Sequence, residues 1–293
     1  MEKPPLILIA LYYLKSKEGE IPLSYPTLTK KLIAIDLDGT TLNAQSLITP
    51  KTQETLIKAQ QQGHTVVIAT GRPFRMSEQF YRQLKLDSAM VNFNGSLTHK
   101  PFKYWEKETE YFIDRAIAFD LKAKKEALGI EFVAAEDRRH FFVSQLDGVD
   151  PTFFGSTKVT NDNLLERLKE NPTSLLIKTR PETLESVAEV LNRSYPDVAT
   201  KTWGGPHNML EMTPKGVHKA TGLALIADDL GFKPKNIMAF GDEYNDVEML
   251  EFAGRGVVMK NGSEQAKKVA NDMTEYTNDE DGLARYLEKY LSL

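Results

Sequence analysis

The sequence predicts an α/β fold in which a doubly wound parallel sheet carries a second, inserted α/β domain. Short apolar runs rich in branched side chains alternate with helix-like stretches after residue 30, and the same alternation returns near the C-terminus. Parallel strands joined by helical crossovers form a sheet that helices cover on both faces. Between the two halves lies a stretch of about a hundred residues with strands and helices of its own, which is long enough for a separate domain.

The first half follows a βαβαβ order. Leu32–Ile35 is predicted to be a strand, because so short an apolar run cannot form a helix. Thr49-Pro50 predicts the start of a helix, with a hydroxyl cap and a proline in the first turn, and Gly63 predicts its end. The elements that follow are a strand at Thr65–Ala69, a helix at Pro73–Leu86 and a strand at Ala89–Phe93.

The second half and the inserted stretch have similar patterns. In the second half we expect helices at Val217–Leu230 and Asp246–Phe252, and strands at Ile237–Phe240 and Gly256–Met259. In the inserted stretch we expect helices at Tyr111–Leu128 and Pro181–Ser194, and strands at Phe141–Ser144 and Leu175–Thr179. We therefore predict a core of residues 30–111 and 206–293 and an inserted cap of residues 112–205, with hinges at Lys100-Pro101 and Trp203-Gly204-Gly205-Pro206.

Residues 1–29 stand apart from this alternation. Their longest apolar run, Leu6–Leu14, is well short of the ~20 residues that span a membrane. Only Lys3 precedes it, and Lys15–Glu20 follow where a signal peptide has small residues, so we expect a cytoplasmic protein without a membrane partner. We expect this extension to be dispensable: it is either a mis-assigned leader, with translation starting near Leu28, or an amphipathic tail packed on the core.

Composition excludes several classes of chemistry. The chain has no cysteine, which excludes disulfides, zinc–thiolate sites, iron–sulfur clusters and a cysteine nucleophile. With 37 basic and 41 acidic side chains the net charge is −4, so the chain lacks the global basic field of a nucleic-acid-binding protein, and we expect no nucleic-acid partner. None of the five histidines has metal-ligand spacing with another, and we interpret them all as structural.

Polar side chains directly follow the predicted core strands. In a doubly wound sheet this edge forms the ligand crevice, so these residues are the first candidates for a functional site. The five strand ends carry Asp36-Leu37-Asp38-Gly39-Thr40, Thr70-Gly71-Arg72, Asn94-Gly95, Gly241-Asp242-Glu243 and Lys260-Asn261.

Asp36 and Asp38 are the most informative pair. Residues two apart on an extended chain point to the same side, and Gly39 permits a sharp turn after them. Two adjacent carboxylates repel unless a cation lies between them. A bound Mg²⁺ would meet that need and neutralise a phosphate group, so that one carboxylate could attack phosphorus and the other transfer a proton. The alternative is that Asp38-Gly39 is only a turn.

These residues make the chain similar to the haloacid dehalogenase-like hydrolase superfamily, and within it to the Cof-type phosphatases, which carry a C2-type α/β cap between their second and third motifs. The resemblance runs from residue 30 to the C-terminus and depends on the order and strand-end positions of four short motifs. They match Asp36-Leu37-Asp38-Gly39-Thr40, Ala69-Thr70-Gly71-Arg72-Pro73, the lysine region Thr213–Lys219, and Gly241-Asp242-Glu243-Tyr244-Asn245-Asp246. The resemblance implies a Rossmann-like core and Mg²⁺-dependent hydrolysis of a small phosphorylated metabolite.

The resemblance also implies a role for each matching residue. Asp36 would be the nucleophile that forms an aspartyl-phosphate, and Asp38 the general acid and then the general base. The phosphoryl group would be bound by the Leu37 amide, Thr70, the Gly71 amide, Lys219 and Asn245. The metal would be held by the Asp36 carboxylate, the Asp38 backbone carbonyl and Asp242, with Glu243 and Asp246 supporting these ligands.

Simpler interpretations exist for several positions. Thr70-Gly71 and Asn94-Gly95 are also typical of turns, and the acidic segment Asp242–Asp246 is also typical of a helix start. Arg72 is either a phosphate ligand or a member of a structural ion pair. Arg138-Arg139-His140 is either a contact for an anionic substrate or a solvated turn.

The third motif contains two candidate lysines. Lys215 precedes Gly216 in a predicted loop, where a long cationic side chain is usually solvated. Lys219 falls in the first turn of the next predicted helix, where the helix dipole disfavours a cation unless an anion lies beside it. We therefore expect Lys219 to face the phosphate and the Asp36 carboxylate.

Two other functions remain compatible with these motifs. A phosphotransferase such as a mutase would use the same aspartyl-phosphate, and a catalytically silent sensor would only bind a phosphorylated metabolite. The presence of both Asp36 and Asp38 argues against the sensor, because a pure binder needs no proton transfer. The sequence does not predict the oligomeric state or the substrate, and sugar phosphates, flavin mononucleotide and pyridoxal phosphate are all compatible with it.

Overall fold

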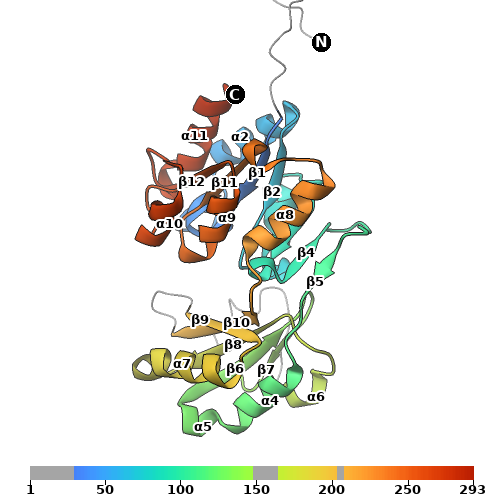
Figure 1. Ribbon diagram of the computed structural model, residues 1–293, viewed down its shortest axis with the longest axis vertical. Coiled ribbons are helices and arrows are strands. Elements are labelled where there is room, and N and C mark those ends of the chain that lie inside the picture. The colour runs from blue at the N-terminus through green and yellow to red at the C-terminus, as the bar shows by residue number, and fades with distance from the viewer. Residues whose placement is uncertain (1–29, 148–163, 203–207) are drawn as a thin grey trace, which may run out of the picture.

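The computed structural model describes residues 30–147, 164–202 and 208–293. Figure 1 shows two bodies, each built around one main sheet, and we call the body with the parallel sheet the core and the other the cap. The predictions for residues 1–29 and for the hinge at Trp203-Gly204-Gly205-Pro206 lie outside the described residues. None of the helices in the described ranges combines the length and the apolar character needed to cross a bilayer.

The core sheet is parallel, with β1 (Leu32–Ile35) in the middle. The strand order is β13-β12-β11-β1-β2, so β11 (Ile237–Gly241) and β2 (Thr65–Ile68) flank β1. A parallel bridge between Ala69 and Val91 joins the end of β2 to β3, from which an antiparallel meander continues. The remaining strands are β3 (Met90–Asn92), β4 (Leu97–His99), β5 (Thr109–Glu110), β12 (Arg255–Val258) and β13 (Asp272–Met273).

Helices cover both faces of the core sheet, as the sequence predicts. Ile33 and Ile35 of β1 pack in the cluster of α2, α3 and α11, whereas Leu32 and Ala34 pack in the cluster of α8, α9 and α10. The helices are α2 (Pro50–Gln61), α3 (Phe74–Gln83), α8 (Lys219–Asp229), α9 (Val247–Phe252), α10 (Glu264–Val269) and α11 (Gly282–Leu291). Because both faces of β1 are buried, its sequence is a continuous apolar run.

The cap sheet is antiparallel, in the order β7-β6-β8-β10-β9. Its strands are β6 (Ile130–Glu136), β7 (Phe141–Val143), β8 (Ser174–Thr179), β9 (Val198–Thr202) and β10 (Met209–Pro214). The helices lie on the side of this sheet that is farther from the core, as Figure 1 shows; they are α4 (Arg115–Ala123), α5 (Lys125–Leu128), α6 (Leu164–Arg167) and α7 (Leu184–Ser194). Leu210 and Met212 pack on the helix side and Met209 on the other, so the residues that alternate with Leu210 and Met212 face the core.

The helix predicted at Tyr111–Leu128 is wrong in its first turn and is divided into α4 and α5. The backbone N–H of Tyr111 donates to the Ser96 carbonyl at 2.8 Å, and the N–H of Ile113 donates to the Pro172 carbonyl at 2.7 Å. These bonds to distant segments hold the chain extended as it leaves the core. Local helix propensity therefore yields to tertiary hydrogen bonds at this position.

Three predicted boundaries also differ from the structure. Met209–Pro214, predicted in the core, forms β10, which pairs with β8 and β9 of the cap sheet. Lys100-Pro101, predicted as a hinge, lies between the paired strands β4 and β5 of the core, so the chain crosses to the cap after β5. The helix predicted to end at Leu86 ends at Gln83, since Lys85 has a φ of 52° that an α-helix does not continue.

Candidate active site

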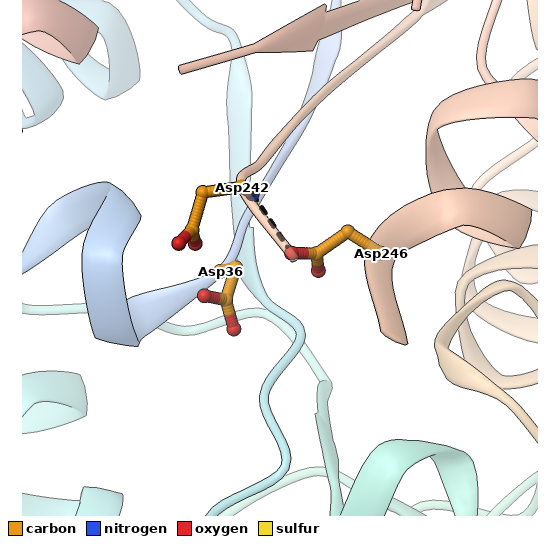
Figure 2. Close-up of side chains that lie close together, drawn as sticks. All are labelled: Asp36, Asp242 and Asp246. Atoms are coloured by element: carbon orange, nitrogen blue, oxygen red, sulfur yellow. Dashed lines mark hydrogen bonds between the residues drawn. The ribbon is translucent and has the colours of Figure 1, made fainter. Parts of the chain in front are cut away.

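Three carboxylates meet at the ends of β1 and β11. Asp36 directly follows β1, Asp242 directly follows β11, and Asp246 lies at the start of α9. Their exposed fractions are 4%, 8% and 0%, and one oxygen of each lies within 4.8 Å of the others. Figure 2 shows the three side chains close together, with Asp246 hydrogen-bonded to the backbone of Asp242. Because neighbouring parallel strands end at one edge, segments distant in the sequence supply adjacent side chains.

Lys219 is the cation of this cluster. Its Nζ donates to Asp36 Oδ1 at 2.6 Å and to Asp246 Oδ1 at 2.7 Å, and its side chain is 1% exposed. Lys219 is the first residue of α8, where the helix dipole opposes a cation unless anions lie beside it. The carboxylates of Asp36 and Asp246 compensate the unfavourable interaction of the lysine with the helix dipole. Lys215, in contrast, is exposed in the preceding loop. The structure thus places Lys219, and not Lys215, against Asp36.

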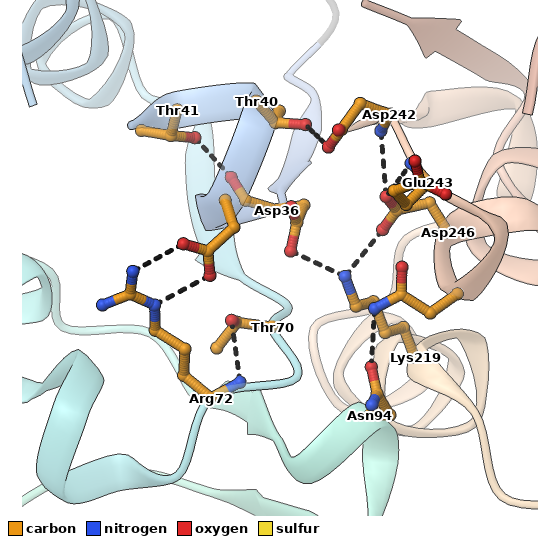
Figure 3. A network of polar contacts seen from close by, with 12 residues as sticks. Asp36, Thr40, Thr41, Thr70, Arg72, Asn94, Lys219, Asp242, Glu243 and Asp246 are labelled. Carbon is orange, nitrogen blue, oxygen red and sulfur yellow. Dashed lines mark hydrogen bonds and ion pairs between the residues drawn. The ribbon is translucent and has the colours of Figure 1, made fainter. Parts of the chain in front are cut away.

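Asp246 also fixes the loop that follows β11. Its Oδ2 accepts from the backbone N–H of Asp242 at 2.9 Å and from that of Glu243 at 3.1 Å, as Figure 3 shows. Asp246 therefore supports both Lys219 and the loop that carries Asp242. Glu243 is exposed, and its carboxylate accepts from the N–H of Tyr244, so it stabilises its own turn rather than the cluster.

Burial changes the ionisation of the cluster. The pKa of Asp36 is raised well above its ordinary value by burial and by the neighbouring carboxylates, although Lys219 opposes this. Burial, assisted by Asp246, raises the pKa of Asp242 to about 7. The pKa of Lys219 is also raised, because its two carboxylate partners outweigh the effect of burial. Lys219 is therefore the charged cation of the cluster, in which three carboxyl groups surround one ammonium group.

The carboxylate cluster fits a divalent cation. Three buried carboxylates against one ammonium leave two formal negative charges, which a divalent ion with oxygen ligands would neutralise. The Asp242 carboxylate is fixed by a bond from Thr40 Oγ1 at 2.9 Å. It also lies so close to Gly39 that a Cβ there would meet Asp242 Oδ2 at 2.1 Å, and Gly39 has a φ of +71°. Asp36 and Asp242 are the carboxylates of the predicted metal set. Both oxygens of Asp246 already accept hydrogen bonds, Oδ1 from Lys219 and Oδ2 from two backbone N–H groups of the loop.

Asp38 lies in a different environment. Its side chain is 58% exposed and forms a bidentate ion pair with Arg72, with Arg72 Nε 2.7 Å from Oδ2 and Nη2 2.5 Å from Oδ1. Of the two interpretations of Arg72, the structure shows the ion pair. Leu37, between the two aspartates, is fully buried and packs in the core. Its anchored side chain fixes the backbone whose amide is a predicted phosphate donor.

The predicted phosphate-binding residues lie around Asn94. Thr70 is buried, and its Oγ1 accepts from the N–H of Arg72 at 3.1 Å. Gly71 lies against the Asn94 amide, because a Cβ at Gly71 would be 3.1 Å from Asn94 Nδ2 and Oδ1. Asn245 Nδ2 donates to Asn94 Oδ1 at 3.0 Å. The structure thus brings these residues to the same edge as Asp36, and the turn at Asn94 connects them.

Two further residues contact this site: Asn261, which the sequence placed at a strand end without a role, and Glu211, which sequence reasoning missed. Asn261 Nδ2 donates to the Gly39 carbonyl at 2.8 Å and so supports the turn after Asp38. Glu211, a buried residue of β10 in the cap, accepts from Asn94 Nδ2 at 3.1 Å. The alternation of Leu210 and Met212 with Glu211 was a signal for a strand, but β10 lacks the continuous apolar run by which the core strands were recognised.

Arg138-Arg139-His140 lies outside the carboxylate cluster. Arg138 pairs with Glu108 at 2.7 Å and contacts His99 Nδ1 at 2.8 Å, while His140 contacts Asp137. All three residues of this segment line a hollow of about 710 Å³ that includes none of the predicted site residues. Arg138 and His140 therefore have protein partners within the described residues.

A doubly wound core, an inserted cap, and a lysine held between two carboxylates at the strand ends together define a capped phosphoryl-transfer enzyme. The chain belongs to the haloacid dehalogenase-like hydrolases, whose family model matches residues 33–287. The resemblance inferred from the four motifs is confirmed.

Relatives of this chain are phosphatases. YitU of Bacillus subtilis, a 5-amino-6-(5-phospho-D-ribitylamino)uracil phosphatase, is 38% identical over 267 residues, which cover 89% of this chain and 98% of YitU. The pyridoxal phosphate phosphatase YbhA of Escherichia coli is 25% identical over 90% of this chain and all of YbhA. A solved haloacid dehalogenase-like hydrolase from Bacteroides thetaiotaomicron is 28% identical with a TM-score of 0.76, and the match covers 89% of this chain and 99% of that one. The chain is accordingly a phosphoric monoester hydrolase.

Proposed function

We propose that the protein is a Mg²⁺-dependent phosphatase that hydrolyses a small phosphorylated metabolite through a phosphoryl group carried on Asp36. The observation that carries this proposal is the pairing of Asp36 with Lys219 beside Asp242, all three being buried at the ligand-binding edge of the sheet. A buried carboxylate that is oriented by a cation and surrounded by other carboxylates is poised for nucleophilic attack rather than for structural support.

In the proposed reaction an Asp36 oxygen attacks phosphorus and the alkoxide leaves. Asp38 gives the leaving oxygen its proton, and then accepts a proton from the water that attacks the aspartyl-phosphate, which returns Asp36 and releases phosphate. Lys219, the amides of Leu37 and Gly71, Thr70 and Asn245 donate to the phosphoryl oxygens as their charge grows. The exposed position of Asp38 supports its role, because a group that exchanges protons with a leaving group and with water must reach both.

Mg²⁺ would be held by the carboxylates of Asp36 and Asp242 and the backbone carbonyl of Asp38, and it would supply charge neutralisation at the phosphoryl oxygens. Thr40 orients Asp242 toward this position by its hydrogen bond. Asp246 keeps Lys219 and the loop in place, which leaves the ion to the other two carboxylates.

The first substrate to test is 5-amino-6-(5-phospho-D-ribitylamino)uracil. Two relatives from Bacillus subtilis, YitU and the 30% identical YcsE, are named as phosphatases of that compound. Pyridoxal phosphate, on which the relative YbhA acts, and sugar phosphates complete the panel. Specificity among them would depend on cap residues facing the core.

Two experiments test the proposal. Purified protein should release phosphate from para-nitrophenyl phosphate with Mg²⁺ and should lose that activity with excess chelator, whereas a silent sensor would show no turnover with either. A mutase would transfer the group to a sugar hydroxyl, so continuous phosphate release to water, without an added acceptor, contradicts that alternative. Activity that is unchanged by chelation would contradict the metal requirement.

A further inference from the structure

Glu211 brings a buried carboxylate from the cap to the phosphate-binding residues of the core. It lies in β10, where Leu210 and Met212 point to the cap helices and Glu211 therefore points to the core. Its exposed fraction is 8%, and Ser174 Oγ of the neighbouring strand donates to Oε1 at 3.3 Å. A carboxylate so buried needs hydrogen-bond donors.

The donor on the core side is Asn94. Asn94 Nδ2 donates to Glu211 Oε2 at 3.1 Å, and Asn94 Oδ1 accepts from Asn245 Nδ2 at 3.0 Å. Figure 3 shows the core part of this chain of contacts, with Asn94 beside Lys219. Glu211, Asn94 and Asn245 thus form a continuous hydrogen-bonded series from the cap to a proposed phosphate ligand.

The chemistry of the three side chains fixes the direction of every bond in the series. A carboxylate can only accept, so the NH₂ group of Asn94 must face Glu211, and its carbonyl must face Asn245. The NH₂ group of Asn245 must then face Asn94, which orients its amide plane and its second N–H. Without an acceptor from Glu211, either amide could rotate to the opposite orientation.

The Asn94 turn packs closely on α8, which anchors the series at its base. Asn94 has a φ of 52°, and Gly95, with a φ of +105°, packs so closely on α8 that a Cβ there would be 2.2 Å from the His218 carbonyl. His218 directly precedes Lys219. The backbone of this turn is therefore held against the residue that precedes Lys219.

The size of the surrounding cavity distinguishes positioning from substrate contact. Asn94, Glu211 and Asn245 line a cavity of about 10 Å³, which holds about one water molecule and no leaving group. In this arrangement Glu211 meets the core and not a substrate.

A second contact joins the same loop to the cap. Tyr244, the residue before Asn245, donates its hydroxyl to the Thr202 carbonyl of β9 at 3.1 Å. Tyr244 thus bonds directly to β9, and Asn245 is connected to the neighbouring strand β10 through Asn94.

We propose that Glu211 is a positioning residue that acts through Asn94 to orient Asn245, so that the cap completes the phosphate-binding pocket of the core. This inference rests on the proposed function, because it takes Asn245 as a phosphate ligand. Its consequence is that affinity for phosphate itself depends on a residue that does not touch phosphate.

Calorimetric binding of inorganic phosphate, with Mg²⁺ present, tests the proposal without requiring turnover. Glu211→Leu and Asn94→Ala should each weaken phosphate about tenfold, the worth of one hydrogen bond to a charged group. The double variant should be no weaker than either single one, since Glu211 acts through Asn94. Glu211→Gln should bind normally, because its carbonyl can still accept from Asn94 while Ser174 accepts from its NH₂ group.

Glu248 provides the matched control, because it lines the same cavity. Glu248→Leu should leave phosphate affinity within about twofold of wild type. Normal affinity in Glu211→Leu, additive losses in the double variant, or losses in turnover that vary with the leaving group would each overturn the inference. Should Glu211→Leu not fold, as judged by its melting curve, Glu211→Ala takes its place. Absence of phosphate binding by the wild type would instead contradict the proposed function.

Discussion

Asp36 and Asp38 are separated by one residue, yet they belong to two contrasting parts of the site. The inner part consists of Asp36, Lys219, Asp242 and Asp246, which are at least nine-tenths buried and mutually bonded. The outer part is the ion pair of Asp38 with Arg72, in which the Asp38 side chain is 58% exposed. The inner part is fixed before substrate arrives, whereas Asp38 can exchange partners.

This contrast matches the two demands of phosphoryl transfer. Charge stabilisation is most effective from preorganised groups in a site of low polarity, which the inner part provides. Proton transfer needs a group that meets the leaving oxygen and then water, which is the role proposed for Asp38 in the outer part. Substitutions in the two parts should therefore fail in different ways.

The largest effect is expected in the inner part. Asp36→Asn removes the nucleophile, and turnover of para-nitrophenyl phosphate should fall by at least about a thousandfold. The melting curve should remain cooperative, because the amide can still accept from Lys219. Steady-state kinetics with full activity in this variant would refute the proposed mechanism.

Asp38→Asn should slow turnover by about 10²–10³-fold and leave a phosphoryl group on the enzyme, because no base activates the attacking water. Mass spectrometry of acid-quenched protein should detect that phosphoryl group with a substrate whose leaving group needs no proton. If Asp38→Asn accumulates none while Asp36→Asn does, the two roles are reversed.

Lys219→Ala should lower kcat/KM on the order of a hundredfold, the cost of one preorganised charge at the transition state. It also leaves Asp36 and Asp246 without their cation, so a lower melting temperature should accompany the loss. Lys215→Ala is the control, since Lys215 is exposed, and it should be near wild type. The reverse pattern would assign the role to Lys215.

Arg72→Lys should have a moderate effect, about tenfold on kcat/KM, because an ammonium cannot reproduce the bidentate contact to Asp38. Stability should hardly change, as Asp38 is exposed and its ion pair contributes little to folding. A variant equal to wild type would show that Asp38 needs no orientation.

The smallest effect concerns the contact of core and cap, where His99 donates from Nε2 to Asn92 and accepts from Arg138. Burial, assisted by Arg138, lowers the pKa of His99 from 6.5 to about 3. Between these values the unfolded chain binds a proton that the folded chain does not, so stability should fall as pH decreases from 6.5. In urea titrations at several pH values, His99→Gln should reduce the slope of the unfolding free energy against pH by the equivalent of up to one bound proton. A slope equal to that of the wild type would contradict this prediction.

The core was predictable because its strands are buried on both faces and end in polar motifs. Leu32–Ile35 is a continuous apolar run too short for a helix, so it could be assigned as a strand. Asp36 and Asp242 directly follow such apolar strands. In β10, Leu210 and Met212 alternate with Glu211, so this strand lacks a continuous apolar run and was not recognised. The partners of Asp38 and Glu211 were not predictable, because Arg72 and Asn94 meet them only through the packing of distant segments.

The short passage from β10 into α8 has a consequence for how such caps can be exchanged between proteins. Pro214 ends a cap strand and Lys219 begins the helix that delivers the ammonium to Asp36. An inserted or deleted residue between them would rotate Lys219 away from its two carboxylates. A chimaera that borrows a foreign cap should therefore keep this junction at its native length.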